Sequence, residues 1–484
     1  MVRCSIALNG EKMKLPMRFI IFFLLLSFTV KGELYQQRLQ GPHQVRILEE
    51  GPASYLERLE LIRSAEKTLD IEYFIFRQDR AGQVLVQALK ERALKGVKVR
   101  ILIDKSPLAP PLGADVAFLL SLYGVEIKYF NPITFLSLSR AFHRTHRKFI
   151  IADGGRMITG GRNIGEEYYL LKKDFSFIDR DIYVEGPIVA NIAQTFEAFW
   201  AHSLSKKPKV KRYHRRAISG DGKLKLRHRR IKKAWKFFLP DAKAQQFQVS
   251  VEQADNGNRA LAPTLTCQDM EFVSDRPDPG KASRLFADVF YAQLEQTKQK
   301  VLMETPYFIT MERDQKILEN LLTQGISLEL VTNSTNSNNH PMVSNVLNRM
   351  IRGWVLKGMK ASFMTAHRPP CLYCSEAPVA DEKVTYGLHS KSTVIDDKTA
   401  MFITFNMDPQ SQLRSIEMGL FCHDGPALAQ ELTKLIEGHK QVSFSFDKDG
   451  RPDNGLGLLQ GTDPWEKFMY FLRFLPSLMF AQLL

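Results

Sequence analysis

A histidine and a lysine recur in this chain at two places with matched neighbours. Residues 146–153 read His-Arg-Lys-Phe-Ile-Ile-Ala-Asp, and residues 389–396 read His-Ser-Lys-Ser-Thr-Val-Ile-Asp. Both octets follow the pattern His-x-Lys-x4-Asp, and each histidine is followed 17 residues later by an asparagine, Asn163 or Asn406. The repetition of the whole pattern indicates a duplicated half-site rather than a chance match.

These residue types suit the displacement of an alcohol from a phosphodiester. Two lysine ammonium groups and two asparagine amides would bind the phosphate as negative charge builds on it. One imidazole could attack phosphorus while the other protonates the leaving oxygen, which requires environments that separate the two histidine pKa values. A phosphohistidine intermediate needs no metal, so we expect no cofactor. The expected set is His146, Lys148, Asn163, His389, Lys391 and Asn406.

Acidic residues near the motifs have two expected roles. A carboxylate on the second ring nitrogen orients a histidine. Asp179 and Glu417 are the candidates, because each opens a strand-like run, 33 and 28 residues after the histidine of its own half. Asp153 and Asp396 close the octets and are included in the catalytic set, although their position at the end of a strand favours a structural role in the turn.

The elements that position these residues recur as well. Strands separated by helix-length segments favour parallel pairing and an α/β architecture. Each histidine motif leads into a short strand, a turn and a second short strand that ends near the asparagine. The repeated plan is strand, helix, glycine and strand: residues 69–76, 83–95, Gly96 and 97–103, then 300–308, 314–324, Gly325 and 326–332.

The second half is longer near its motif. Gly96 and Gly325 are 229 residues apart whereas the motif histidines are 243 apart, so about 14 extra residues precede His389. The stretch 365–381 is the expected place for them, where they would shape substrate access. Within it, Cys371 and Cys374 favour a local disulfide or two thiols over a metal site. Five cysteines in 484 residues are too few for a disulfide framework.

These residues resemble the phospholipase D superfamily, specifically its bacterial phospholipase D-like and cardiolipin-synthase-like branch. The resemblance covers roughly Tyr55 to Glu437 and includes residues 160–168 (GGRNIGEEY), 304–308 (ETPYF) and 417–420 (EMGL). It implies two tandem α/β/α sandwich halves related by pseudo-twofold symmetry, with one active site at their interface. It also implies that His146 is the nucleophile, that His389 is the general acid and then the base, and that the lysines and asparagines hold the phosphate.

One position departs from the family pattern. Where the family has Gly-Ser-x-Asn, this chain has Ile403-Thr404-Phe405-Asn406. Thr404 keeps a hydroxyl and is assigned to phosphate binding. Ile403 replaces a glycine that allows close packing near phosphate, so we expect an altered substrate pocket.

The composition describes a globular chain with a local basic segment. With 44% hydrophobic and 25% charged residues, 484 residues can build two halves with their own cores. Residues 206–236 contain 15 Lys and Arg and one acidic residue, so this segment is +14 and the rest of the chain carries only +1 of the net +15. We expect an exposed connector whose end, residues 231–238, is a basic-aromatic patch.

Both termini are apolar. Basic residues precede 12 apolar or small residues, Phe19 to Val30. A membrane span needs about 20 residues, so the run fits a signal-peptide core, particularly with a start at Met13. An uncleaved anchor helix is the alternative, and Cys4 is a candidate for acylation. The segment from Trp465 to Leu484 is either a helix packed on the core or a helix lying on a bilayer surface.

The expected layout follows from these features. It comprises a leader (residues 1–32), a first phospholipase D-like half (33–205), a polybasic connector (206–240), a second half (241–460) and an apolar amphipathic C-terminal segment (461–484). The leader predicts a membrane-associated protein exported to the periplasm or beyond. The connector and tail predict an anionic phospholipid membrane surface as the partner.

The leading functional hypothesis is hydrolysis of membrane glycerophospholipids to phosphatidic acid through a phosphatidyl-histidine. The alternative is a cardiolipin-synthase-type transfer, in which a second lipid alcohol replaces water at the same residues. A nuclease of the same superfamily is a weaker hypothesis, because an apolar leader and tail serve DNA poorly, and we expect no nucleic-acid partner. A non-enzymatic lipid binder is the last class.

Overall fold

The structure is a computed structural model of the whole chain. It describes residues 5–8, 11–14, 34–106, 112–133, 135–215, 217, 228–280, 283–338, 340–375, 383–455, 457–459, 462, 464–473 and 477. Most of the expected leader, including Cys4, lies outside the described residues. Two short strands, β1 (Ser5–Leu8) and β2 (Glu11–Lys14), form an antiparallel hairpin within it.

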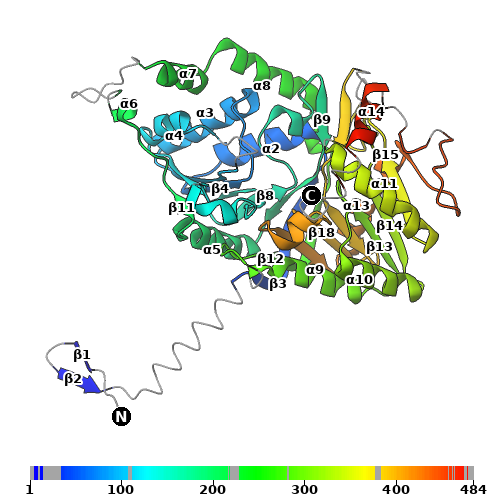
Figure 1. The fold of residues 1–484 in the computed structure, drawn as a ribbon. Coiled ribbons are helices and arrows are strands. Elements are labelled where there is room, and N and C mark those ends of the chain that lie inside the picture. Colours follow the sequence, from blue (N-terminus) through cyan, green and yellow to red (C-terminus); the bar gives the residue numbers. More distant parts are fainter. Residues whose placement is uncertain are drawn as a thin grey trace.

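A single 16-stranded sheet runs through both halves, and its strand order is symmetric about its centre. The order is β11-β6-β5-β4-β7-β8-β10-β3 followed by β12-β19-β18-β17-β13-β14-β15-β20. The two long strands β3 (Gln36–Leu48) and β12 (Thr264–Ser274) pair antiparallel at the centre and join the halves, which lie side by side in Figure 1. The predicted pair of α/β/α halves with pseudo-twofold symmetry is confirmed, and the continuous sheet is the added finding.

Equivalent strands repeat in each half. In the first half they are β4 (Thr68–Tyr73), β5 (Lys98–Asp104), β6 (Glu126–Phe130), β7 (Phe149–Ala152), β8 (Arg156–Gly160), β9 (Phe175–Ile178), β10 (Asp181–Glu185) and β11 (Ser205–Lys206). In the second half they are β13 (Lys300–Glu304), β14 (Ser327–Asn333), β15 (Lys360–Met364), β16 (Thr385–Leu388), β17 (Ser392–Ile395), β18 (Thr399–Ile403), β19 (Met418–His423) and β20 (Ser443–Phe444).

The predicted pairing is confirmed for the repeated strands. β4, β5 and β6 are parallel, as are β13, β14 and β15. Most of their residues are buried, including the charged Asp70 and Glu72 of β4, because helices cover both faces of the sheet. The strand that follows each histidine motif, β7 or β17, pairs antiparallel with β4 or β13, so each motif begins beside the carboxyl end of a central strand.

Helices form the two outer layers. One layer holds α2 (Gly51–Arg63), α3 (Arg80–Leu94) and α4 (Ala114–Ser121) in the first half, and α9 (Leu285–Glu295), α10 (Glu312–Thr323) and α11 (Pro341–Leu356) in the second. The other layer holds α5 (Ile188–Ala201) and α13 (Pro426–Lys440), whose apolar faces share one core with β3, β12 and the neighbouring strands. Since this core draws on both halves, neither half is expected to fold without the other.

The expected boundary after the connector is wrong. Beyond α6 (Arg212–Arg215), two helices, α7 (Arg229–Phe238) and α8 (Ala242–Asp255), pack on α2, α3 and α4 of the first half. Ile231, Ala234 and Phe238 are buried in that core, while the lysines and arginines of α7 remain exposed. Residues 242–255 therefore belong with the first half, and the connector is exposed on one face only.

The extra residues of the second half are divided between two places. The segment between β14 and β15 (residues 334–359) is five residues longer than the segment between β5 and β6 (residues 105–125), and it contains the longer helix α11. Residues 365–388, up to the second histidine, are nine more than residues 131–145. The prediction that the loop at 365–381 holds the whole insertion is thus only partly correct.

Two disulfides are present, Cys371–Cys374 and Cys267–Cys422. The first is one of the two predicted alternatives. The second was not predicted and links β12 to β19 across 155 residues. Its sulfurs come from two strands that are adjacent only in the folded sheet, which spacing in the sequence does not reveal.

At the C-terminus, α14 (Pro464–Leu472) packs on α11 through Tyr470, whose carbonyl accepts from Asn345 and whose hydroxyl accepts from Asn348. Its other face leaves Trp465, Phe468, Phe471 and Leu472 exposed by 56% or more. Among the described residues, none of the helices combines the length and apolar character needed to traverse a bilayer.

Candidate active site

Each histidine segment lies along a segment of the opposite half. β16, which leads to His389, pairs parallel with β9, and the His389 amide donates to the carbonyl of Ile178 at 2.7 Å. Likewise Thr145 forms a bridge with Ile416, and the His146 amide donates to the carbonyl of Ile416 at 2.9 Å. The next residues along β9 and toward β19 are Asp179 and Glu417. The crossing places each acid beside the histidine of the other half.

His146 is oriented by the second half. Its Nδ1 lies 3.1 Å from Oε2 of Glu417 and 3.0 Å from the carbonyl oxygen of Thr404. Both partners are acceptors, so Nδ1 carries the proton and the lone pair is on Nε2. Glu417 is held in turn by the hydroxyls of Thr404, at 2.5 Å, and Ser411, at 2.9 Å. The imidazole is thereby presented as a nucleophile.

His389 is oriented by the first half. Its Nδ1 lies 2.5 Å from Oδ2 of Asp179. The structure thus places both predicted acids, Asp179 and Glu417, against Nδ1 of a histidine. The expectation that each acid serves the histidine of its own half is wrong, because the β9–β16 pairing exchanges the two segments.

The two lysines stand beside both histidines in one buried cluster. Lys148 donates to the carbonyl of His146 at 2.6 Å, and Lys391 donates to the carbonyl of His389. Burial lowers the pKa of Lys148 to about 7 and that of Lys391 to about 8. The shifts arise from the cost of burying the two ammonium groups, which a bound anion would offset.

Burial and the lysine charges also act on the histidines. Burial and then the Lys391 cation lower the pKa of His389 to about 3, and burial lowers that of His146. Both shifts favour the neutral imidazole, whereas the proposed chemistry was expected to need opposite shifts in the two histidines. The side chains of His389 and His146 are 10% and 14% exposed, whereas both lysines are almost fully buried, so the imidazoles are the more accessible of these four groups.

Both asparagines are buried, and each is linked to the cluster through a neighbour. The side-chain oxygen of Asn163 accepts from the amide of Ile75 at 3.0 Å, and the Asn163 side chain also bonds to Tyr168, whose ring lies beside His389. The backbone amide of Asn406 donates to Ser411, which bonds to Glu417. Asn406 is buried, and among the described residues its side-chain oxygen has no hydrogen-bond partner. Amide groups placed in this way can donate to phosphate oxygens.

Asp153 and Asp396 lie outside this cluster, and their inclusion in the catalytic set is wrong. Each follows its motif strand with φ near +50°. Asp153 accepts from the backbone amides of residues 66–68, and Asp396 accepts from those of residues 298–300. The two carboxylates tie the turn after each motif to the strand alongside it. The structural role favoured by their position is the correct one.

The expectation for Ile403 and Thr404 also needs correction. Ile403 is 4% exposed and sits opposite Gly419, where an added Cβ would lie 2.7 Å from the isoleucine methyl. At the matching positions of the first half, Gly160 lies opposite Asp181. In this half the glycine stands on β19 rather than on β18, and Ile403 fills the core space beside it. The Thr404 hydroxyl, predicted to bind phosphate, donates to Glu417 instead.

The first-half equivalent of Thr404 is Gly161, and this difference fits the two acids. An added Cβ on Gly161 would lie 2.0 Å from Oδ1 of Asp179. In the first half, the Asp179 carboxylate therefore occupies the space next to Gly161 that corresponds to the side chain of Thr404 in the second half. There Thr404 supplies a hydroxyl to the longer Glu417 instead.

Sequence reasoning did not assign roles to the aromatic residues around the histidines. The ring of Phe74 lies edge-on to His146 at 5.3 Å between centroids. Phe177 and Tyr168 lie 5.0 and 5.5 Å from His389. Tyr168 belongs to the family motif at residues 160–168, and Phe74 lies in the expected strand 69–76, so both positions were open to prediction. Their contact with the imidazoles depends on tertiary packing.

A buried charge network next to His389 was also missed. Arg180 donates to Glu304 at 2.6 Å and to Ser390 at 3.1 Å. His439 lies between Glu304, at 2.5 Å, and Glu49, at 3.0 Å. Although burial alone would lower it, these carboxylates raise the pKa of His439 to about 9. The network holds the segments that carry Asp179 and His389 together.

Comparisons with known proteins agree with this geometry. The family described as Cardiolipin synthase, PLD-like domain, matches residues 59–200 and 290–440, which include both histidines. An uncharacterized protein of Helicobacter pylori (strain ATCC 700392 / 26695) is 26% identical over 447 residues, covering 86% of this chain and 84% of that protein. Cardiolipin synthase C of Escherichia coli (strain K12) is 27% identical over 419 residues, covering 83% and 86%.

A solved structure is similar over almost the whole chain. The crystal structure of phosphatidylserine synthase from Haemophilus influenzae Rd KW20 superposes with a TM-score of 0.65 at 16% identity, covering 95% of this chain and 99% of that one. This similarity shows the fold alone. The family match, which spans more than half of the chain, establishes that the chain belongs to the cardiolipin synthase, PLD-like domain family and is an enzyme of the phospholipase D superfamily.

Proposed function

We propose that this enzyme is a phosphatidyltransferase that moves a phosphatidyl group from one phospholipid to the alcohol of another, with cardiolipin as the product. The observation that carries the proposal is the crossed site, in which two oriented imidazoles meet two buried lysines and two asparagines. The similarity to Cardiolipin synthase C of Escherichia coli favours transfer over the hydrolysis that the sequence first suggested.

In the first step, Nε2 of His146 attacks phosphorus, and the bond to the leaving glycerol breaks. His389 gives its proton to the departing oxygen. The bound phosphodiester is an anion, and its charge favours the protonated form of His389 that the free site disfavours. Lys148 and Lys391 balance the charge on the phosphate while the phosphatidyl-His146 bond forms.

In the second step, neutral His389 takes the proton of the incoming lipid alcohol, whose oxygen attacks phosphorus and displaces His146. Two molecules of phosphatidylglycerol thus give cardiolipin and glycerol. Water would give phosphatidic acid by the same route. The limited exposure of both histidines and the rings of Phe74, Tyr168 and Phe177 restrict water near the intermediate, which favours the lipid alcohol.

The test uses purified full-length protein and vesicles of phosphatidylglycerol, with lipid products measured by mass spectrometry. The proposal expects cardiolipin in excess of phosphatidic acid, and no product from His146→Ala. The matched control is His423→Ala, because His423 is buried on β19 and bonded to Glu271 away from the cluster. If phosphatidic acid is the main product, the transfer proposal is wrong and the enzyme is a hydrolase.

Membrane contact is part of the same proposal, and α14 is its candidate element. Tyr470 on α14 bonds to Asn348, which bonds to Thr335 in the loop after β14. Asn333, at the end of β14, bonds to the backbone of Leu388, next to His389. The exposed aromatic face of α14 therefore lies over the sheet edge that carries the site, as a helix embedded in a bilayer surface would.

Vesicle co-sedimentation tests this contact. Replacement of Trp465, Phe468 and Phe471 by serine should weaken binding to phosphatidylglycerol vesicles at least tenfold, since each large apolar side chain contributes about 1.5–3 kcal/mol when buried. The control is Leu94→Ser, because Leu94 is 63% exposed on α3, away from α14. Equal losses in both variants would argue against α14.

Export is the final element of the proposal. Disulfides persist in oxidising compartments and are rare in the cytosol. Two of them, one fully buried between β12 and β19, support maturation outside the cytosol. Fractionation of cells into cytosol, periplasm and membranes, with thiol labelling of each fraction, tests it: reduced cysteines in the mature protein would contradict export.

A further inference from the structure

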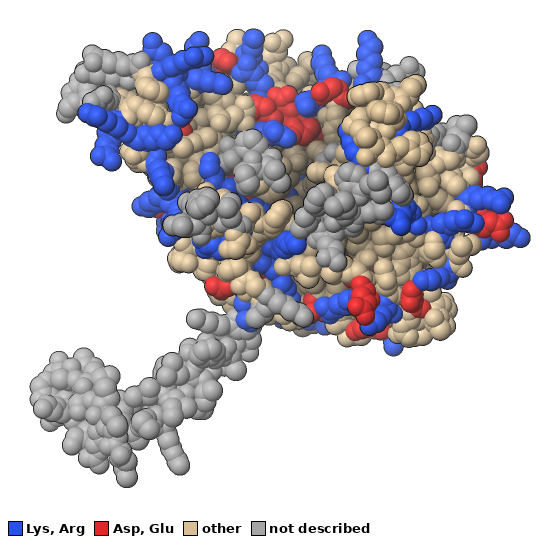
Figure 2. Space-filling model, viewed as in Figure 1, with Lys and Arg blue, Asp and Glu red and all other residues tan. Residues whose placement is uncertain are grey.

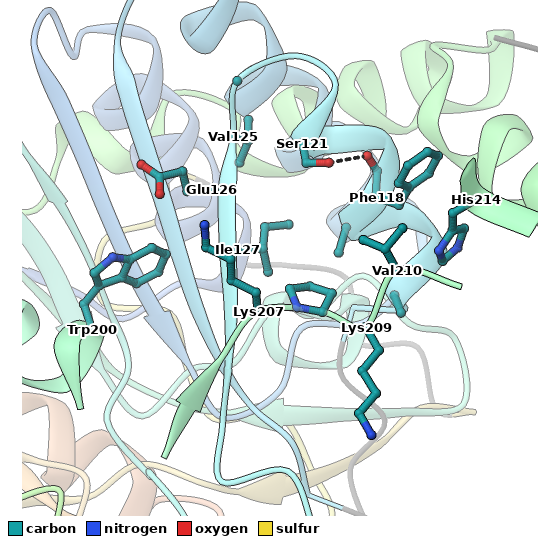
Figure 3. Close-up of a pocket in the computed structure, with 14 residues that line it drawn as sticks. Phe118, Ser121, Val125, Glu126, Ile127, Trp200, Lys207, Lys209, Val210 and His214 are labelled. Atoms are coloured by element: carbon teal, nitrogen blue, oxygen red, sulfur yellow. Dashed lines mark hydrogen bonds between the residues drawn. The ribbon is translucent and has the colours of Figure 1, made fainter. Parts of the chain in front are cut away.

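A cavity separate from the active site lies at the outer edge of the first half. It has a volume of about 260 Å³ and is walled by α4, the beginning of β6 and residues 207–210. Figure 3 shows Trp200 and Lys207 on one side and Phe118, Val210 and His214 on the other. In the sheet, β4 and β5 separate β6 from the strand that follows the first histidine motif, so the cavity is not part of the catalytic cluster.

The cavity wall is fixed by specific contacts. Tyr213 and His214 each bond to Oδ1 of Asp115 at 2.7 Å, and the ring of His214 stacks on Phe118 at 4.6 Å. These bonds tie the connector to α4. Phe118 and residues 207–210 both line the cavity. The contacts of Tyr213 and His214 with Asp115 fix the position of the chain that follows residues 207–210.

The interior is mostly apolar and the mouth is basic. The apolar lining includes Phe118, Val125, Ile127 and Trp200, and Val210 is 51% exposed at the entrance. In Figure 3 the Lys207 side chain runs toward Glu126 and Trp200, and the Lys209 side chain points away from the other lining residues. Glu126 is the single acidic residue of the lining.

The mouth opens onto a larger basic surface. Figure 2 shows lysine and arginine side chains gathered over the part of the molecule where Figure 1 places α6 and α7. We define the basic surface by its exposed members: Lys206, Lys207, Lys209, Lys211, Arg212, Arg215, Arg229, Arg230, Lys232, Lys233 and Lys236. Near an anionic bilayer, each contributes about 1 kcal/mol of attraction.

We infer that this cavity binds one acyl chain of an anionic phospholipid, with the phosphate of the same lipid at Lys207 and Lys209. An apolar interior with a cationic mouth matches the two ends of such a lipid. The volume lies below the range of about 300–1,000 Å³ typical of pockets for whole ligands, so it fits a single chain and leaves the headgroup outside. The site would hold the first half against the membrane independently of the reaction.

An anionic lipid fits better than nucleic acid or a peptide. Nucleic acid would use the basic surface but has no apolar chain for the cavity. A peptide could insert one side chain, but the basic surface would then demand an acidic partner along its whole length. The lipid satisfies both features with one molecule, and a bilayer supplies further phosphates to the remaining lysines and arginines.

Photo-crosslinking tests the site directly. Full-length protein is mixed with medium-chain lysophosphatidylglycerol that carries a diazirine at the end of its chain, and labelled peptides are identified by mass spectrometry. The inference expects labelling of α4 or of residues 200–210. Ser121→Phe should reduce this labelling at least tenfold, because Ser121 is exposed at the cavity wall. Leu122→Phe is the matched control, since Leu122 is 42% exposed and outside the lining.

Two double charge-reversal variants distinguish lipid binding in the cavity from general electrostatic attraction to the basic surface. Lys207→Glu with Lys209→Glu should weaken labelling more than Lys232→Glu with Lys233→Glu, which changes the same net charge elsewhere on the basic surface. Any of four results would overturn the inference. Two concern the labelling itself: labelling confined to the catalytic peptides, or equal labelling by lysophosphatidylcholine. The other two are equal effects of the two charge pairs, and competition by an acidic peptide but not by phosphatidylglycerol. Cardiolipin formation, measured on the same samples, reports separately on the proposed reaction.

Discussion

The crossed pairing of acids and histidines makes a prediction that a pairing within each half does not. In Glu417→Gln, the carbonyl of Thr404 still accepts from Nδ1 of His146, so the tautomer is kept. The lost feature is the negative charge. Attack on phosphorus places positive charge on His146, and the carboxylate no longer stabilises it.

The size of this loss follows from the geometry. Oε2 of Glu417 lies 3.1 Å from Nδ1 of His146. With charge centres about 5 Å apart and an effective dielectric constant of about 20, the attraction is about 3 kcal/mol. A barrier raised by that amount slows the formation of phosphatidyl-His146 about a hundredfold. Asp179→Asn should instead impair the proton transfers of His389, because Asp179 lies 2.5 Å from its Nδ1.

The assay uses a phosphatidyl ester of p-nitrophenol and follows the burst of p-nitrophenolate on mixing. This leaving group departs without a proton, so formation of the intermediate no longer needs His389. Glu417→Gln should slow the burst about a hundredfold. Asp179→Asn should leave the burst nearly unchanged and slow the later step, in which His389 must activate the alcohol.

The opposite pattern would refute the reasoning. If Asp179→Asn slows the burst and Glu417→Gln does not, either the acids act within their own halves or the histidines have exchanged roles. Mapping the trapped phosphohistidine by mass spectrometry separates these cases, since a label on His146 leaves only the first. Equal slowing of the burst by both variants would mean that neither acid serves one histidine in particular.

Three further predictions concern the framework. Gly161→Ala should lower the transfer rate more than tenfold, because the alanine Cβ would lie 2.0 Å from Oδ1 of Asp179. The measurement is the initial rate of transfer, and the control is Thr404→Ser, which keeps a hydroxyl at the equivalent position. The carboxylates that raise the pKa of His439 to about 9 should stabilise the fold by about 3 kcal/mol below pH 6.5, the ordinary pKa, and lose this contribution as pH rises through 9. Urea unfolding of wild type and His439→Gln should therefore differ at pH 6 and converge above pH 9, and a constant difference would contradict it. Removing Cys267–Cys422, which spans 155 residues, should cost about 5 kcal/mol of unfolding free energy, against about 2 kcal/mol for Cys371–Cys374, which spans 3; equal urea midpoints would oppose the loop-entropy argument.

Local patterns predicted the repeated halves because they determine local structure. The apolar runs at 97–103 and 326–332 became the parallel strands β5 and β14. Each octet contains the first strand of a hairpin, β7–β8 or β17–β18, as expected. Asp153 and Asp396 could be assigned to turns from their place at the end of a strand. In each case the deciding interactions lie within a few residues or within one repeat.

The errors concern interactions between segments far apart in the chain. The prediction for Ile403 rested on comparison with a family glycine at the same position. In the sheet, Ile403 fits because the small Gly419 faces it, just as Gly160 faces the larger Asp181 in the first half. Residues 242–255 were placed by their position after the connector, whereas α8 packs where α2 and α3 leave an apolar face. No single-position pattern contains this information, because the compensating residue lies on another strand or helix.

The crossing also predicts that neither copy of the motif functions alone. A first half by itself contains His146 and Lys148 but lacks Glu417, the carboxylate beside Nδ1 of His146. A second half by itself contains His389 but lacks Asp179. Since β9 pairs with β16 and Thr145 bridges Ile416, the contacts that join the halves also deliver the acids, and assembly of the sheet and assembly of the site are one event. A duplication that began with two equal copies would be held in this form, because loss of either acid disables the histidine of the other half.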